Sequence, residues 1–270
     1  MCIPNQFLCI LCFCISLFSA STIAAELQKS SRPESLEDRP KIGLALSGGG
    51  ARGAAHLGVL YVIEELRVPI DYIAGTSMGA IIGGLFASGM SPAEIEKAML
   101  SIDWVSVFED KTPRPDISFR RKRDDDFSLM RAKPGFRDNA IQLPPAFIIG
   151  QKFDIVLSRL TLPVAGVNDF DKLKIPFRAV ATDIITGEGV ILSSGNLAVA
   201  IRASMSVPGA FAAVEKGDKL LVDGGVANNL PIDVVRGMGA DIVIAVDIST
   251  PLLPREELDS ALSIVDQLTG

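Results

Sequence analysis

A short serine motif flanked by glycines constrains the fold of this chain more than any other feature. Residues 75–79 read G-T-S-M-G, between an apolar run at 70–74 and a helix-favouring stretch that begins at residue 80. Strand, G-x-S-x-G and helix is the order of a nucleophile elbow, a strained turn that lifts a serine hydroxyl above a sheet. Gly75 and Gly79 are required because a side chain at either position would clash in so tight a turn. We therefore predict an α/β sheet with Ser77 as a nucleophile at the end of a strand.

A serine hydroxyl is a weak nucleophile, so it needs a proton acceptor within hydrogen-bond reach. The chain contains one histidine, His56, which falls within the first turns of a predicted helix at 51–66. In α/β-hydrolases the catalytic histidine follows the serine in the sequence instead. We interpret His56 as a buried structural residue, keep it as the alternative base, and expect a carboxylate to act on Ser77 directly.

Asp223 is the best-placed carboxylate. It follows an apolar run at 220–222 and precedes Gly224 and Gly225, which allow a sharp turn and the close approach of another segment. Residues at the carboxyl ends of parallel strands converge on one edge of a sheet, so Asp223 can meet Ser77 there. The alternative is an ordinary Asp-Gly-Gly turn. Because Ser77 lacks a well-placed histidine, we predict that Asp223 is the proton acceptor.

A third block, the glycine-rich turn at 48–53, joins a predicted strand at 42–46 to the helix at 51–66. Backbone N–H groups in such a turn stabilise negative charge, and one oxyanion donor contributes about 2.7–4 kcal/mol. The predicted oxyanion hole consists of Gly48, Gly49, Gly50, Arg52 and Gly53. Arg52 either orients a substrate phosphate or carboxylate, or pairs with an acid to fix the loop. The G-x-G-x-x-G spacing also fits a dinucleotide-binding turn, but that site needs an acid where the Ser77 elbow stands.

In order and spacing, these three blocks resemble the patatin-like phospholipase family over residues 40 to 250. The resemblance implies a three-layer α/β fold and a lipid acyl hydrolase (phospholipase A1/A2 or lysophospholipase) with a Ser–Asp dyad. Ser77 would be the nucleophile, Asp223 the proton acceptor and the glycine-rich turn the oxyanion hole. The substrate would be a phospholipid or lysophospholipid at a membrane surface, with no calcium requirement. The alternatives are acyl transfer to an acceptor other than water, and a membrane-recruited binding module with a vestigial site.

Three further segments, at 119–122, 135–138 and 250–256, are more specifically similar to bacterial patatin-type autotransporters. In those proteins this domain is the passenger, and the resemblance implies a C-terminal barrel domain that is absent from this chain. Residues 251–270 then read as a helical segment and as a truncated linker to that domain. A domain that works alone is the alternative.

The amino-terminal segment has the pattern of an export signal. The first 25 residues carry no charge, and an apolar run at 7–18 is followed by small residues. We predict a signal peptide at 1–25 and a flexible lead-in at 26–39, and hence a secreted, periplasmic or outer-membrane protein. Because no Lys or Arg precedes the apolar run, a retained membrane anchor or a mis-assigned start codon is the alternative.

Composition excludes several other classes of protein. All four cysteines lie in the predicted leader, so the predicted mature chain has no disulfide framework and no thiolate metal site. With a single histidine in addition, we expect neither a metal nor a cofactor. The net charge of −6, without a basic stripe, argues against nucleic acid as a partner.

The order of predicted elements favours one domain at 40–250, with a mostly parallel central sheet and helices on both faces. Ser91, Pro92 and Glu94 form a typical helix start. Residues 186–189 predict a hairpin turn, and residues 203–209 read as a helix end packed near the site. The predicted strands are 42–46, 70–74, 176–182, 189–192, 220–222 and 242–246, and the predicted helices are 51–66, 78–88 and 232–238.

Overall fold

A computed structural model describes residues 39–109, 115, 118–120, 135–137, 140–142, 150–249, 251, 254–257 and 267. The chain divides into two units, Met1–Pro40 and Lys41–Gly270, and the account below concerns the second. The predicted signal peptide, nearly all of the lead-in and most of the predicted C-terminal helical segment lie outside the described residues.

The second unit is built on a seven-stranded sheet with the order β7-β8-β5-β2-β1-β9, in which β6 also pairs with β5. The strands are β1 (Ile42–Leu46), β2 (Tyr72–Thr76), β5 (Phe177–Asp183), β6 (Gly189–Leu192), β7 (Val214–Lys216), β8 (Lys219–Asp223) and β9 (Ile242–Val246). The pairs β1–β2, β1–β9 and β2–β5 are parallel. The pairs β5–β6, β5–β8 and β7–β8 are antiparallel. A separate antiparallel pair consists of β3 (Gly135–Arg137) and β4 (Ala140–Gln142).

The α/β fold class predicted from the sequence is confirmed. The sheet is less parallel than predicted, because two hairpins contribute strands that run against the central ones. The hairpin at 186–189 was expected, and it joins β5 to β6 with Thr182 opposite Gly189. The hairpin of β7 and β8 was not expected, because the three residues of β7 are too few to give a recognisable pattern.

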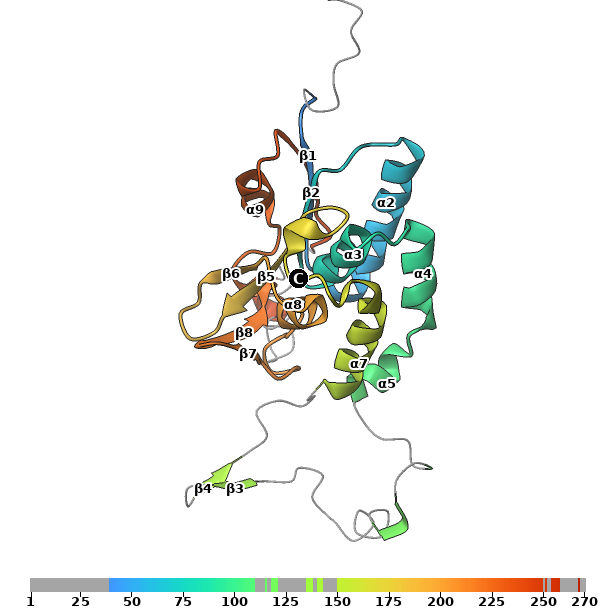
Figure 1. The fold of residues 1–270 in the computed structure, drawn as a ribbon. Coiled ribbons are helices and arrows are strands. Elements are labelled where there is room, and N and C mark those ends of the chain that lie inside the picture. The colour runs from blue at the N-terminus through green and yellow to red at the C-terminus, as the bar shows by residue number, and fades with distance from the viewer. Residues whose placement is uncertain are drawn as a thin grey trace, which may run out of the picture. The chain divides into compact units, whose positions relative to one another are not determined.

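Helices cover both faces of the sheet, as Figure 1 shows with α9 on one side of β1 and β2 and with α2, α3 and α4 on the other. The helices are α2 (Ala55–Glu65), α3 (Met78–Ala87), α4 (Pro92–Ser101), α5 (Trp104–Glu109), α7 (Gln151–Leu160), α8 (Leu197–Ser204) and α9 (Ile232–Gly237). The short 3-10 turns are η1 (Gly50–Ala54), η3 (Leu162–Val164), η4 (Phe170–Lys172), η5 (Gly224–Val226) and η6 (Arg255–Glu257). The predicted start of α4 is confirmed, since Ser91 and Glu94 form a capping box.

Alternation along the central strands explains the two layers of helices. Leu44, Leu46 and Ile73 belong to the larger apolar core, whereas their neighbours Ala45 and Ala74 belong to a smaller core. Successive strand residues point to opposite faces of a sheet, so each strand supplies both cores. The smaller core includes Val234 and Val235 of α9. Its strand residues Ala45 and Ala74 are small, which lets this short helix lie close to the sheet.

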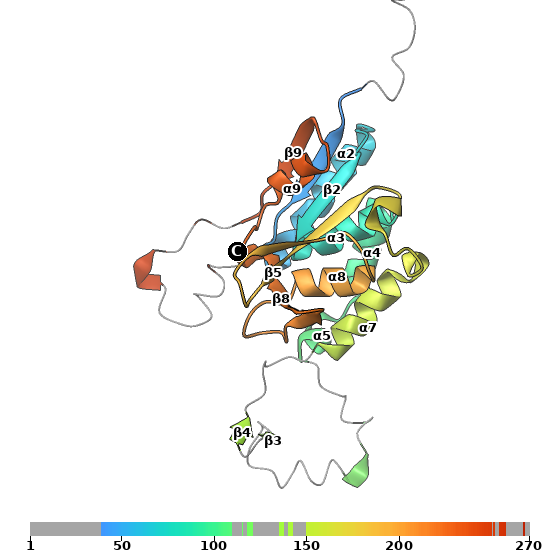
Figure 2. The same cartoon turned by 60° about the vertical axis from the view of Figure 1, so that its left-hand side comes forward.

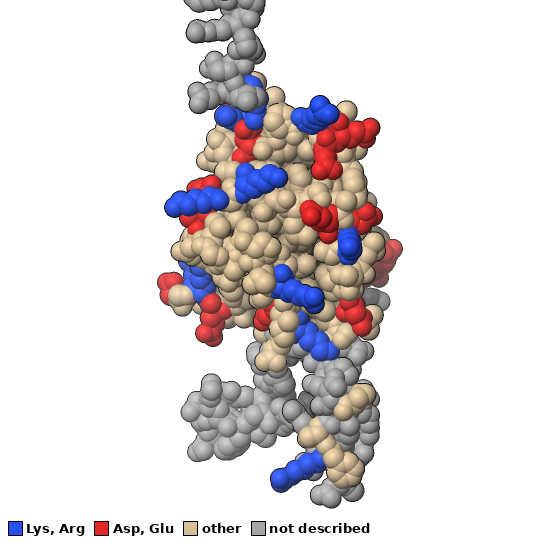
Figure 3. Space-filling view, turned by 45° about the vertical axis from the view of Figure 1, so that its right-hand side comes forward, with Lys and Arg blue, Asp and Glu red and all other residues tan. Residues whose placement is uncertain are grey.

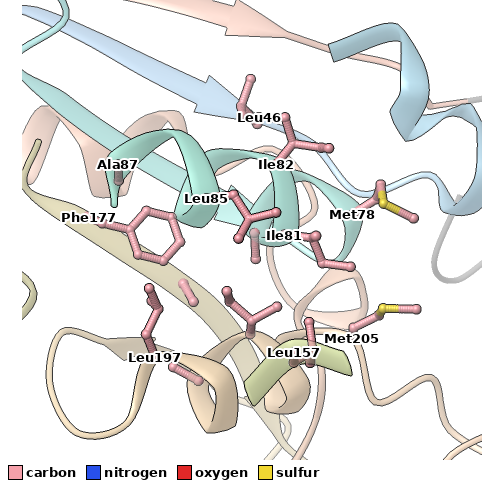
Figure 4. Packing of buried hydrophobic residues seen from close by; sticks show 14 of the residues in the cluster. Leu46, Met78, Ile81, Ile82, Leu85, Ala87, Leu157, Phe177, Leu197 and Met205 are labelled. Carbon is pink, nitrogen blue, oxygen red and sulfur yellow. The ribbon is translucent and has the colours of Figure 1, made fainter. Parts of the chain in front are cut away.

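Helix α3 is the central helix of the larger core, and nearly all of its residues are buried. Figure 4 shows Ile81 and Leu85 pointing toward Leu157 of α7 and Leu197 of α8, while Ile82 lies toward Leu46 of β1. Figure 2 shows α7 alongside α8 below this layer. A helix packed on all sides has little freedom to shift. Ser77, which directly precedes α3, is therefore held rigidly.

Charged side chains of both signs are scattered over the face seen in Figure 3, and large uncharged areas separate them. Among the residues that the structure describes, none of the helices has both the length and the apolar character needed to cross a bilayer.

Candidate active site

Ser77 is the residue at which β2 turns into α3, and its backbone is strained. Its φ of 52° and ψ of −118° lie in a region that residues other than glycine rarely adopt. A side chain at Gly75 would overlap the backbone of Gly79, and one at Gly79 would overlap the carbonyl groups of Leu46 and Ser47. The turn therefore has the geometry of a nucleophile elbow, with glycines where the backbone leaves no room.

Asp223 lies within hydrogen-bonding distance of the serine. The Ser77 hydroxyl donates to Asp223 Oδ2 at 2.7 Å, and the Gly225 N–H donates to Oδ1 at 2.8 Å. Both members of the pair are buried, with 5% of Ser77 and none of Asp223 exposed. A side chain at Gly224 would overlap the carbonyl group of Val180, so this glycine lets the end of β8 lie against β5. The structure thus brings together the predicted nucleophile and the predicted proton acceptor.

The strands bring these two residues together in a different way from the one expected. We expected two parallel strands to deliver Ser77 and Asp223 to one edge of the sheet, but β8 runs antiparallel to β5, which is itself parallel to β2. Strand β6 pairs along one edge of β5, so β2 and β8 both pair with the other edge, one after the other along it. Thr76 pairs with Val180, and Asp223 pairs with the next residue, Ala181. The carboxyl ends of β2 and β8 therefore meet directly.

Burial tunes the acidity of Asp223. Desolvation raises the pKa of this carboxyl to about 6, while hydrogen bonds from Gly225 and Ser77 act in the lowering direction. A carboxyl with this pKa is mostly ionised at neutral pH, yet it binds a proton far more readily than an ordinary aspartate. This proton affinity approaches that of histidine and suits a general base.

His56 has a different environment. Its side chain is fully buried, and its Nε2 lies 2.9 Å from the carbonyl oxygen of Ser47. Burial lowers the pKa of the imidazole, which favours the neutral ring. Within the described part of the chain, Nδ1 has no hydrogen-bond partner. These contacts place His56 under the glycine-rich turn, as a support for the backbone that leads into it.

The glycine-rich turn follows β1 and leads into η1. The Gly48 N–H donates to the carbonyl oxygen of Asn229 at 3.2 Å and to its Oδ1 at 3.0 Å. This amide was predicted to be an oxyanion donor, but it is already engaged. The N–H groups of Gly49 and Gly50 have no acceptor among the described residues, so they are the donors that the turn leaves available. Gly49 and Gly50 adopt φ values of 151° and 54°, where glycine is favoured.

Two other members of the predicted oxyanion hole have distinct surroundings. Gly53 faces Met78, and a side chain on Gly53 would overlap that methionine. Gly53 is therefore a position at which only glycine fits against Met78. Among the described residues, Arg52 has no acidic partner, and its Nε is buried without a hydrogen bond. The part of the chain that the structure describes therefore gives Arg52 no acid to pair with, and contact with a substrate anion stays a prediction.

Sequence reasoning missed the residues that join the three blocks. The Ser77 N–H donates to Ser204 Oγ at 2.9 Å, and the Thr76 hydroxyl donates to the carbonyl oxygen of Asn228 at 2.9 Å. Together with Asn229, these residues fix the elbow and the glycine-rich turn. The sequence predicts a helix end near the site at residues 203–209, and α8 does end at Ser204. Within the described ranges, no group of three or more His, Cys, Asp or Glu residues could hold a metal ion.

The fold and this site define an α/β protein with an elbow serine hydrogen-bonded to a buried aspartate and no histidine between them. The sequence profile of the family described as patatin-like phospholipase matches residues 44–236. The chain belongs to this family, so the resemblance drawn from the three motifs is confirmed. The similarity to autotransporter passengers stays a prediction.

Relatives of known sequence include an uncharacterized NTE family protein of Mycobacterium bovis, 35% identical over 78% of this chain and 49% of that protein. Patatin-like phospholipase domain-containing protein 7 of Rattus norvegicus is 33% identical over 81% of this chain and 14% of that protein. This chain therefore spans half or less of the length of these relatives. Among solved structures, VipD from Legionella pneumophila matches with a TM-score of 0.44 and 16% identity, over 74% of this chain and 48% of that one.

Proposed function

We propose that this protein is a lipid acyl hydrolase that uses Ser77 and Asp223 as a dyad. The observation that carries the proposal is the 2.7 Å hydrogen bond from the hydroxyl of a strained elbow serine to a buried carboxylate. A structural role alone explains neither the strained backbone of Ser77 nor a buried carboxylate that has no cation beside it among the described residues. Membership in the patatin-like phospholipase family supports the same chemistry.

The proposed reaction has two steps. As Ser77 Oγ attacks the ester carbonyl carbon, Asp223 Oδ2 takes the hydroxyl proton, and the carbonyl oxygen becomes an oxyanion. The N–H groups of Gly49 and Gly50 donate to this oxyanion, together with that of Met78, the residue after the nucleophile. The C–O bond then breaks, and the departing alcohol takes the proton from Asp223. Water, deprotonated by the same carboxylate, then attacks the acyl carbon. The bond from this carbon to Ser77 Oγ breaks, Ser77 takes the proton back from Asp223, and the fatty acid is released.

A phospholipid or lysophospholipid is the proposed substrate, of the phospholipase A1/A2 or lysophospholipase type. Arg52 belongs to the turn that supplies the oxyanion donors and has no acidic partner among the described residues. A guanidinium there fits the phosphate of such a lipid, because its planar fork matches phosphate oxygens. No cofactor is required by this chemistry.

Product analysis tests the proposal. We expect the purified protein to release free fatty acid and lysophospholipid from vesicles of phosphatidylcholine, or free fatty acid and glycerophosphocholine from lysophosphatidylcholine. Mass spectrometry of the products with and without added alcohol separates hydrolysis from acyl transfer, because an acyltransferase would form the alkyl ester instead. Intact lipid after incubation, together with no labelling by a fluorophosphonate probe, would favour the vestigial binding module and contradict the proposal.

We also propose that the protein is exported by its amino-terminal segment, because 1–25 is an uncharged apolar stretch that ends in small residues. Expression of the full chain in a Gram-negative host, followed by fractionation and intact-mass measurement, tests this. We expect a product that begins near Glu26 in the periplasm or the medium. An uncleaved protein in the inner-membrane fraction would indicate a retained anchor, and an uncleaved protein in the cytoplasm would contradict export.

A further inference from the structure

One short segment of chain touches the backbone of both members of the proposed dyad. It runs from Ser204, the last residue of α8, to Ser206, and both serines are fully buried. The Ser204 hydroxyl oxygen accepts the N–H of Ser77 at 2.9 Å, and its own proton is donated to the carbonyl oxygen of Val180 at 2.5 Å. The Ser206 carbonyl oxygen accepts the N–H of Asp223 at 2.9 Å.

The Ser204 hydroxyl therefore links three points of the site. It accepts from the N–H of Ser77 and donates to the carbonyl group of Val180, the β5 residue that pairs with Thr76. Two residues further along the chain, the Ser206 carbonyl oxygen accepts the N–H of Asp223. Strained backbone persists only where its surroundings over-determine it. Ser77 is such a residue, with its φ of 52°. Its buried N–H finds its acceptor in the Ser204 hydroxyl.

We infer that Ser204 is a positioning residue, which holds the Ser77 backbone in its strained conformation so that the hydroxyl stays in line with Asp223. This inference rests on the proposed function of Ser77 and Asp223. Ser204 itself does not touch the substrate. Without its hydroxyl, the Ser77 N–H and the Val180 carbonyl group both lose a partner, and the elbow relaxes toward a conformation that points Oγ away from the carboxylate.

The neighbouring Ser206 offers a matched control. It is equally buried, but its hydroxyl accepts from Arg202 Nη1 at 2.6 Å and donates to the Arg202 carbonyl oxygen at 2.8 Å. Removing this hydroxyl deletes a buried serine contact of the same kind while leaving the bond from Asp223 to the Ser206 carbonyl intact. Ser204→Ala and Ser206→Ala therefore differ in whether the lost hydroxyl contacts the nucleophile.

Steady-state kinetics on a soluble short-chain ester provide the first test. We expect Ser204→Ala to lower kcat by about ten- to a hundredfold, the effect of leaving one buried hydrogen-bonding group unpaired, with KM changed by no more than about twofold. Ser204→Thr, which keeps the hydroxyl, should restore most of kcat. Ser206→Ala should stay within about threefold of the wild type. A Ser204→Ala variant with wild-type kcat, or a Ser206→Ala variant with an equal loss, would overturn the inference.

Hydrogen exchange at the Ser77 amide provides a second test that does not depend on turnover. We expect this amide to exchange at least about tenfold faster in Ser204→Ala than in the wild type, and at the wild-type rate in Ser206→Ala. If Ser204→Ala does not fold, Ser204→Cys replaces it, because a thiol is a weak acceptor of similar shape. Inactive wild-type protein with a protected Ser77 amide would contradict the proposed function, whereas unchanged exchange in the variant would contradict the role of Ser204.

Discussion

Replacing Ser77 by alanine is expected to lower kcat on a soluble short-chain ester by about ten-thousandfold or more. The variant lacks the only atom that can form the acyl-enzyme, and removal of a serine nucleophile in other hydrolases has an effect of this size. The remaining activity comes from binding and from the oxyanion donors alone. Labelling by a fluorophosphonate probe should disappear in the same variant, because the probe reacts only with an activated serine.

His56→Gln serves as the control for this experiment. Glutamine keeps a side-chain N–H that can reach the Ser47 carbonyl oxygen, which the His56 Nε2 contacts at 2.9 Å. If Asp223 alone accepts the proton, this variant should keep most of its activity and its labelling. A His56→Gln protein that folds but is as inactive as Ser77→Ala would show that the imidazole is the base.

Replacing Asp223 by asparagine is expected to lower kcat by about a thousandfold or more, because an amide cannot take the serine proton. The asparagine oxygen can still accept the Gly225 N–H, so the turn after β8 should persist. In the wild type, kcat/KM should fall about tenfold per pH unit below about 6, since desolvation raises the pKa of the Asp223 carboxyl to about 6 and the base must be ionised. A pH profile that is flat down to pH 5 would contradict Asp223 as the base.

The same pKa predicts how stability depends on pH. Because the folded-state pKa of Asp223, about 6, exceeds the usual value of about 3.9, the folded protein binds the proton more tightly than the unfolded chain does. This contribution to stability is complete below about pH 4 and is lost as the pH rises through 6, a change of about 3 kcal/mol in the free energy of unfolding.

Asp223→Asn should lack this loss of stability. Denaturant unfolding of both proteins at pH 4, 5, 6 and 7 measures the difference, and we expect the inactive variant to be at least as stable as the wild type at pH 7. A variant that is clearly less stable than the wild type at pH 7 would mean that the carboxylate stabilises the fold and is not a buried group kept at a cost.

The sequence predicted those parts of the site that depend on local geometry. Ser77 could be placed because a tight turn between strand and helix leaves a local signature in Gly75 and Gly79, and β1, β6 and β9 begin and end where predicted. The direction of β8 could not be predicted, because strand pairing is set by tertiary contacts and not by a pattern within the strand. Ser204 and Asn229 were missed for a related reason. Their bonds to Ser77 and Gly48 cross 127 and 181 positions of the chain, and no periodicity marks such side chain–backbone contacts.

The position of Asp223 at the end of a small hairpin has a consequence for how the protein responds to heat. Strand β8 is joined to β5 by three residue pairs, and its other neighbour is the three-residue strand β7. Ser77, by contrast, lies between the central strand β2 and the fully packed helix α3. Small peripheral units open locally at a lower free energy than the core. We therefore expect Asp223 to separate from Ser77 through detachment of β7 and β8 at a temperature below the melting of the whole domain, so that activity is lost on heating before the fold is.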